Sequence, residues 1–217
     1  LIAQVRVDTD DLTPDYLSTD ANITAWLNEA EQEACIRKLL IHDTSTAAVC
    51  NIAVTAGTSV YSLHPSIIAI TRAGFTPAGS DTEQVLYLTD ITELDRIYPN
   101  WRKYSELPKY AIQNDTTLQL ASKPSTDGAL VLECHRLPLL DIEDQVTTSP
   151  EIGRIHHRHL VQWVLHRAYS RPDAEIFNPN KAATALTEFE RVFGLRQSAT
   201  AQRSSQANRP HFNKAIW

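Results

Sequence analysis

The sequence predicts an α+β protein: an antiparallel helical bundle with an inserted small antiparallel β domain and an extended C-terminal arm. Three observations predict it. Both flanks of the body carry apolar side chains at helical spacing, the middle alternates short β-branched runs with turn residues, and the final stretch is polar, basic and poor in aliphatic residues. We expect a lead segment and first bundle helix over residues 1–46, the β domain over 47–138, two bundle helices over 139–194 and the arm over 195–217.

The first predicted helix spans residues 20–41, after an irregular lead that contains Pro14. Polar residues of this segment, among them Glu31, are expected away from the apolar face. Ser18, Thr19 or Asp20 can accept hydrogen bonds from its first free amides. The side chains near one helical face are Ile23, Trp26, Leu27, Ala30, Ala34, Leu40 and Ile41.

The middle of the chain is predicted to form a small antiparallel sheet, because turn residues such as Gly57, Gly74 and Gly128 separate its β-branched runs. Asp90 and Glu93 have the spacing of a capping box and predict a single short helix that ends before Pro99. The predicted strands are residues 49–54, 60–63, 67–71, 85–88, 110–113 and 130–134.

Two further helices are predicted. One runs over residues 150–170, with Pro150 in its first turn and Ile155 among its apolar positions. It is expected to pack on the first helix. The other begins after Asn178, where a capping residue precedes a proline, and ends at Gly194.

Length and composition indicate one soluble, cytosolically made folding unit, since 217 residues with 42% hydrophobic content can close a core. We find neither about 18 uninterrupted apolar residues nor a basic-then-apolar leader, so no membrane association is expected. Cys35, Cys50 and Cys134 are odd in number and lack CxxC spacing, which predicts buried free thiols.

The charge of the chain is unevenly distributed. Residues 191–217 carry five basic residues and no acid, which leaves about −11 for residues 1–190 of a chain whose net charge is −6. A basic tail can bind nucleic acid, an anionic membrane or an acidic protein surface, and charge alone does not choose among these partners.

No catalytic motif is evident. The sequence lacks a GxSxG elbow, a Walker-type loop and a GxGxxG turn, so we predict no enzymatic activity, no cofactor and no metal. The alternative is a metal-dependent hydrolase that uses His156, His157 and His159, of which His156 and His159 share a helical face. The competing interpretation makes these histidines ordinary polar positions of an amphipathic helix.

A second set on the same predicted helix, Arg154, Arg158 and His166, could contact a neighbouring subunit, a DNA channel or only solvent. A DNA-binding module that uses this set and the basic tail is a further alternative, against which the overall acidity of the chain counts.

The C-terminal segment cannot form a core of its own, and its terminal aromatic residue predicts docking on a partner, with disorder as the other interpretation. Trp26, Trp101 and Trp163 are interpreted instead as core or interface anchors. The predicted partner-binding residues of the arm are Arg196, Arg203, Arg209, Phe212, Lys214 and Trp217.

Three segments occur in an order that resembles tailed-bacteriophage head-to-tail adaptor (connector or neck) proteins. They are residues 26–30 (WLNEA), 94–101 (LDRIYPNW) and 107–112 (LPKYAI), and the likeness continues through 118–124, 128–138 and 151–194. The resemblance spans nearly the whole chain apart from its ends, and it lies in pattern and order rather than in one diagnostic motif.

This resemblance implies a structural virion protein that forms a homo-oligomeric ring, often twelve-fold in the family, beneath the portal. It implies that the ring extends the DNA channel, that the C-terminal arm binds the portal protein and that a tail or nozzle protein docks on the distal face. It also implies contact with transiting DNA without sequence specificity, and a location in the virion neck after assembly in the host cytoplasm.

Overall fold

The computed structural model describes residues 1–143, 148–172 and 175–196 and divides the chain into two compact units. The helical unit consists of Leu1–Ile41 together with the described residues from Arg136 onward, and the β unit consists of His42–His135. The expectation of a mixed α+β protein is confirmed.

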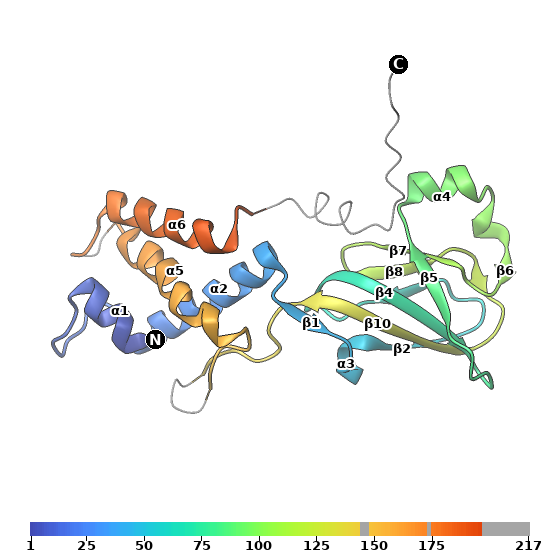
Figure 1. Ribbon diagram of the computed structural model, residues 1–217, viewed down its shortest axis with the longest axis horizontal. Coiled ribbons are helices and arrows are strands. Elements are labelled where there is room, and N and C mark those ends of the chain that lie inside the picture. Colours follow the sequence, from blue (N-terminus) through green and yellow to red (C-terminus); the bar gives the residue numbers. More distant parts are fainter. Residues whose placement is uncertain (144–147, 173–174, 197–217) are drawn as a thin grey trace, which may run out of the picture. The chain divides into compact units, whose positions relative to one another are not determined.

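Four helices and one short 3₁₀ helix make up the helical unit (Figure 1). Within this unit, α5 packs against both α2 and α6, and α1 contacts α2 and α5. Their buried side chains, including Leu27, Leu160, Val164 and Phe189, form its apolar interior. The elements are α1 (Ile2–Thr9), α2 (Asp20–Lys38), η2 (Arg154–His156), α5 (His157–Tyr169) and α6 (Pro179–Phe193).

The predicted starts of α2, α4 and α6 and the end of α6 are confirmed, whereas the first helix ends at Lys38 and not at Ile41, because Leu39 adopts the left-handed conformation and Ile41 begins β1. The Thr19 side chain accepts from the Asn22 amide at the start of α2. Asn178 caps α6, with Pro179 as the first helical residue, and Gly194 ends that helix with a φ of 86°. Asp90 accepts from the Glu93 amide at the start of α4 (Ile91–Ile97) in the β unit. Local side-chain chemistry therefore determines where these helices begin.

The β unit is a curled sheet in the strand order β1-β10-β4-β5-β7-β8-β3, with β2 paired to β10 and a separate β6-β9 pair (Figure 1). The helical turns α3 (Ala47–Cys50) and η1 (Trp101–Lys103) and helix α4 interrupt it. Its strands are β1 (Ile41–Asp43), β2 (Asn51–Val54), β3 (Val60–Ser62), β4 (Ile67–Pro77), β5 (Gln84–Leu88), β6 (Ser105–Glu106), β7 (Tyr110–Gln113), β8 (Thr117–Leu120), β9 (Lys123–Pro124) and β10 (Gly128–Arg136).

The main core of the β unit lies inside the curled sheet, where Phe75, Leu118, Leu130 and Leu132 are fully buried. A smaller cluster forms where Leu94 of α4 and Trp101 pack on Ile112 and Ala121. Cys35 of the helical unit and Cys50 and Cys134 of the β unit are buried free thiols, as predicted.

The prediction of a purely antiparallel sheet is wrong. The pairs β5–β7 and β6–β9 are parallel, although β4–β5, β7–β8, β3–β8 and β2–β10 are antiparallel. The chain leaves β5, passes through α4 and returns to start β7 from the same end, and such a crossover makes two neighbouring strands parallel.

Several predicted boundaries are also wrong. The lead that was expected to be irregular contains α1, which buries only Val5 and Arg6 and so lacks an apolar stripe that the sequence could reveal. Residues 49–50 lie in α3 rather than in a strand. The β unit was expected to contain a single short helix, but α3 and η1 add two helical turns to α4. The helix expected from Pro150 begins at His157, and Ile155 is 81% exposed instead of buried.

Candidate functional site

The end of α6 is held by two basic residues of α2. Arg37 Nη1 donates to the Gly194 carbonyl at 3.1 Å and lies 3.3 Å from Glu190 Oε1, while Lys38 Nζ donates to the Val192 carbonyl at 3.1 Å. Cations are favoured here, because the last carbonyls of a helix lack partners within the helix and carry partial negative charge. We call this set of contacts the α6 clamp.

Further contacts from α2, α5 and α6 hold the Arg37 side chain in place. Its Nε donates to Glu33 at 3.2 Å, and its guanidinium lies 5.5 Å from the Trp163 ring centroid and 5.2 Å from that of Phe189. The Trp163 and Phe189 rings are 5.1 Å apart at their centroids. The clamp therefore packs on two aromatic rings of the helical unit, the buried Phe189 and the half-buried Trp163.

Of the predicted arm residues, Arg196 alone lies within the described residues. Its Nη1 is 2.9 Å from Glu33 Oε1, so Glu33 bridges Arg196 and Arg37. This ion pair extends the α6 clamp to the last described residue. The other five predicted arm residues, Arg203, Arg209, Phe212, Lys214 and Trp217, lie outside the described part of the chain.

The predicted contact residues of α5 do not share one environment. Arg154 in η2 and Arg158 in the first turn of α5 are both exposed. His166 is half-buried instead, and its Nδ1 lies 3.0 Å from the Ala182 carbonyl of α6. Arg154 and Arg158 thus present charge to the surroundings, whereas His166 joins two helices.

The three clustered histidines point to different partners. His157 Nε2 contacts the Ile152 carbonyl at 2.8 Å, and the His156 ring packs 5.7 Å from that of Phe193. Burial lowers the pKa of His156. Across residues 1–143, 148–172 and 175–196, no three His, Cys, Asp or Glu side chains are grouped in a way that could hold a metal ion.

Sequence reasoning missed the most deeply buried acid. Glu31 of α2 is 1% exposed, and its Oε1 accepts from the Ile152 amide at 3.0 Å. Burial raises the pKa of Glu31, and the carboxylate of Glu151 adds to this effect. Glu31 lies four residues after Leu27 and therefore on the apolar stripe of α2. This helical spacing is the sequence signal that could have predicted its burial.

Arg136 and Glu151 complete this polar junction. Arg136 is 6% exposed and donates through Nη1 and Nη2 to the two carboxylate oxygens of Glu151, at 3.0 and 2.5 Å. Glu31 thus attaches the segment before η2 to α2, and Arg136, at the end of β10, holds Glu151 of the same segment.

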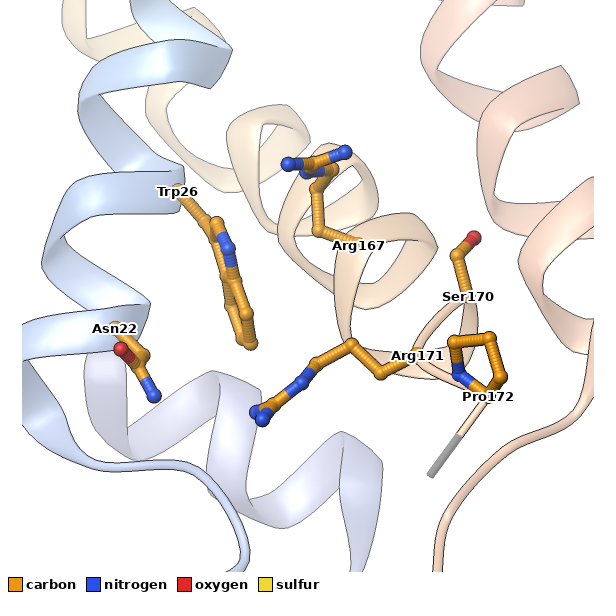
Figure 2. A pocket seen from close by; sticks show the side chains of 6 residues that line it. All are labelled: Asn22, Trp26, Arg167, Ser170, Arg171 and Pro172. Atoms are coloured by element: carbon orange, nitrogen blue, oxygen red, sulfur yellow. The ribbon is translucent and has the colours of Figure 1, made fainter. Parts of the chain in front are cut away.

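One pocket, with a volume of about 360 Å³, opens between α2 and the end of α5 (Figure 2). Figure 2 shows the Trp26 ring as one wall, with the side chains of Arg167 and Arg171 beside it. Arg167 pairs with Glu29 at 3.1 Å, and the Arg171 guanidinium lies 6.0 Å from the Trp26 ring centroid. The remaining lining residues are Asn22, Ser170 and Pro172.

Of the two guanidinium groups at this pocket, that of Arg171 lies over the Trp26 ring, and that of Arg167 already pairs with a carboxylate. The Ser170 hydroxyl donates to the His166 carbonyl at 2.6 Å, and no acid–base pair accompanies it among the lining residues. Trp26 is half-buried and lines this pocket.

None of the helices in the described residues is both long enough and apolar enough to span a membrane. A comparison with protein families finds that the family described as SU10 adaptor protein matches residues 1–211. A comparison with curated proteins finds no match.

Proposed function

Because the chain belongs to the SU10 adaptor protein family, a family of phage head-to-tail adaptors, we propose that it forms a closed ring under the portal, which extends the DNA channel and docks tail components. As an adaptor, the protein has a structural role in the neck of the virion, where such proteins interact with portal and tail proteins. What we propose beyond this is that the protein forms a ring, that the ring has twelve subunits, and which surfaces its subunits use.

The observation that carries this proposal is the α6 clamp. It fixes the end of α6 on α2 through Arg37, Lys38 and the Arg196–Glu33 pair, so that the following segment starts from a rigid position. That segment, residues 195–217, has four basic residues and no acid, and too few aliphatic residues for a core. We propose that residues 195–217 form an extended arm that binds the portal protein from the helical bundle.

Several copies of the arm in one ring would bind the portal more tightly than a single arm does. An ordered arm loses chain entropy on binding, but many linked copies raise the effective concentration of each remaining arm. Portal docking through Arg203, Arg209, Phe212, Lys214 and Trp217 would therefore be effectively permanent in a ring, although one arm binds weakly.

A ring requires one heterologous surface pair that each subunit reuses. The exposed Arg154 and Arg158 and the pocket beside Trp26 are proposed as contacts to a neighbouring subunit or to the channel. His166 would support such a contact indirectly, through the packing of α5 on α6. A net charge of −6 suits a channel through which DNA moves without sequence-specific binding. No observation in the described residues favours the hydrolase or the DNA-binding module.

The test is portal binding by a chain that ends at Arg196, compared with the full chain. We expect the truncated chain to lose portal binding, measured by interferometry, while its thermal unfolding stays within about 1 °C, because the clamp residues remain. A matched control keeps residues 197–217 in scrambled order, with composition and charge unchanged. Portal binding by the truncated chain as tight as that of the full chain would contradict the proposed arm.

A further inference from the structure

Four tyrosine rings form an unbroken row on the β unit. The ring centroids of Tyr87 and Tyr110 are 5.8 Å apart, those of Tyr110 and Tyr98 6.3 Å, and those of Tyr98 and Tyr104 5.5 Å. Tyr87 is 60% exposed and Tyr104 is 44% exposed, while the two inner rings are half-buried. We call these four residues the tyrosine row.

The fold explains how residues distant in sequence meet here. Tyr87 of β5 lies opposite Tyr110 of β7 in their parallel register. Tyr98 ends α4, and Tyr104 follows η1, so the excursion between β5 and β7 supplies the other two rings. The row is thus a product of the parallel crossover that sequence analysis missed.

Tyr98, one of the two inner rings of the row, is held in place by a hydrogen bond. The Tyr98 hydroxyl donates to Glu106, and this hydrogen bond together with burial raises the pKa of Tyr98 to about 12. Rigid, neutral aromatic rings with polar tips lose little entropy on binding, which is why tyrosine is enriched in protein interfaces.

Three lysines adjoin the row along the backbone. Lys103 precedes Tyr104, Lys109 precedes Tyr110 and its carbonyl accepts from the Tyr87 amide at 2.9 Å, and the Lys123 amide donates to the Tyr104 carbonyl at 3.0 Å. All three side chains are exposed, and none has a carboxylate partner within the described part of the chain.

The neighbouring arginines differ from these lysines. Arg96 pairs with Glu93 at 2.6 Å and Arg102 pairs with Asp95 at 2.7 Å, so local acids are already engaged. Three exposed lysines without a carboxylate partner in the described residues therefore lie on the same backbone segments as the tyrosine row, in a protein whose net charge is −6. Apolar exposure continues beside it at Val85, which is 51% exposed, and Leu107, which is 40% exposed.

We propose that the tyrosine row and its three lysines bind an acidic segment of a different virion protein, an inference that rests on the proposed adaptor function for the virion context. Aspartate and glutamate side chains of that segment pair with the lysines, and its apolar side chains lie on the rings. A nucleic-acid base cannot insert between Tyr98 and Tyr104, because these two rings stack on each other with a 15° interplanar angle.

A zero-length carbodiimide reagent tests this on intact virions, since it joins a lysine amine directly to a carboxylate that it contacts. Mass spectrometry should find Lys103, Lys109 or Lys123 joined to an aspartate or glutamate of another virion protein. Links from these lysines only within the chain, only to a second copy of it, or to no protein would overturn the inference. Virions that lack the chain altogether would overturn the proposed function itself.

Charge reversal gives an independent readout. Lys103→Glu with Lys109→Glu should reduce the amount of the cross-linked virion protein that particles retain about tenfold, because like charges oppose each other across the contact.

Tyr87→Ser with Tyr104→Ser should reduce the retained amount of that virion protein similarly, because the aromatic contact is lost, while the thermal unfolding of the variant stays unchanged. Lys181→Glu, an exposed lysine of the helical unit, is the matched control and should leave retention unchanged. Full retention in both double variants would refute the proposed surface.

Discussion

Glu31 shows how one polar residue can organise a junction between helices. Its carboxylate lies on the apolar stripe of α2 and accepts from the Ile152 amide just before η2. A buried amide without a partner costs about 1–3 kcal/mol, so Glu31→Ala should lower the free energy of unfolding by about that amount. Glu31→Gln keeps one accepting oxygen for the Ile152 amide, removes the charge and replaces the other oxygen by an NH2 donor.

The same residue predicts a pH dependence. Burial raises the pKa of Glu31 above its ordinary value near 4.5, so the folded state binds this proton more tightly than the unfolded state. The stability that Glu31 contributes is therefore fully present below about pH 4.5 and is lost as the pH rises through the folded pKa. Relative to Glu31→Gln, the wild-type protein should lose unfolding free energy as the pH rises above about 4.5, as measured by urea denaturation.

Glu93→Gln is the control for that experiment. The hydrogen bond from Arg96 lowers the pKa of the exposed Glu93, so its contribution is present at neutral pH and lost as the pH falls. The two variants should therefore diverge from the wild type in opposite directions. Parallel pH profiles for the wild type and Glu31→Gln would contradict the prediction.

Among the elements, α6 depends on chemistry at both of its ends. Asn178 Oδ1 accepts from the Lys181 amide at 3.0 Å, and an asparagine cap contributes about 1 kcal/mol relative to alanine. Asn178→Ala should lower the free energy of unfolding by about that amount and increase hydrogen exchange in the first turn of α6. Asn180→Ala, an exposed change two residues further on, should leave both nearly unchanged. Equal effects of the two substitutions would show that the cap contributes little.

The strands illustrate a limit of local patterns. Residues 110–113 form β7 as predicted, because alternation and flanking turns define a short strand. The pairing of β7 with β5 in parallel depends on the path through α4, which no local pattern in either strand encodes. The tyrosine row follows from that pairing, so this candidate surface could not be predicted from the sequence.

The whole molecule consists of two units with separate interiors. Every residue of the main β-unit core lies between Val49 and Cys134, so this core needs no residue from the helical unit. We predict that excised residues 42–135 fold alone with a stability of about 5 kcal/mol or more. Trp101, the only tryptophan in this range and 1% exposed, should report one cooperative urea transition by fluorescence. A gradual, non-cooperative change would mean that the β unit depends on its flanking helices.

The sequence by itself determined the α+β class, the starts of α2, α4 and α6, the buried thiols and the resemblance to head-to-tail adaptors, because periodicity, capping and composition act over a few residues. Only the tertiary structure decided that α1 forms, that Glu31 is buried, that Arg37 and Lys38 clamp α6, and that four tyrosines meet in a row. These features arise from contacts between residues far apart in the chain, and their energies depend on burial and partners that appear only after folding.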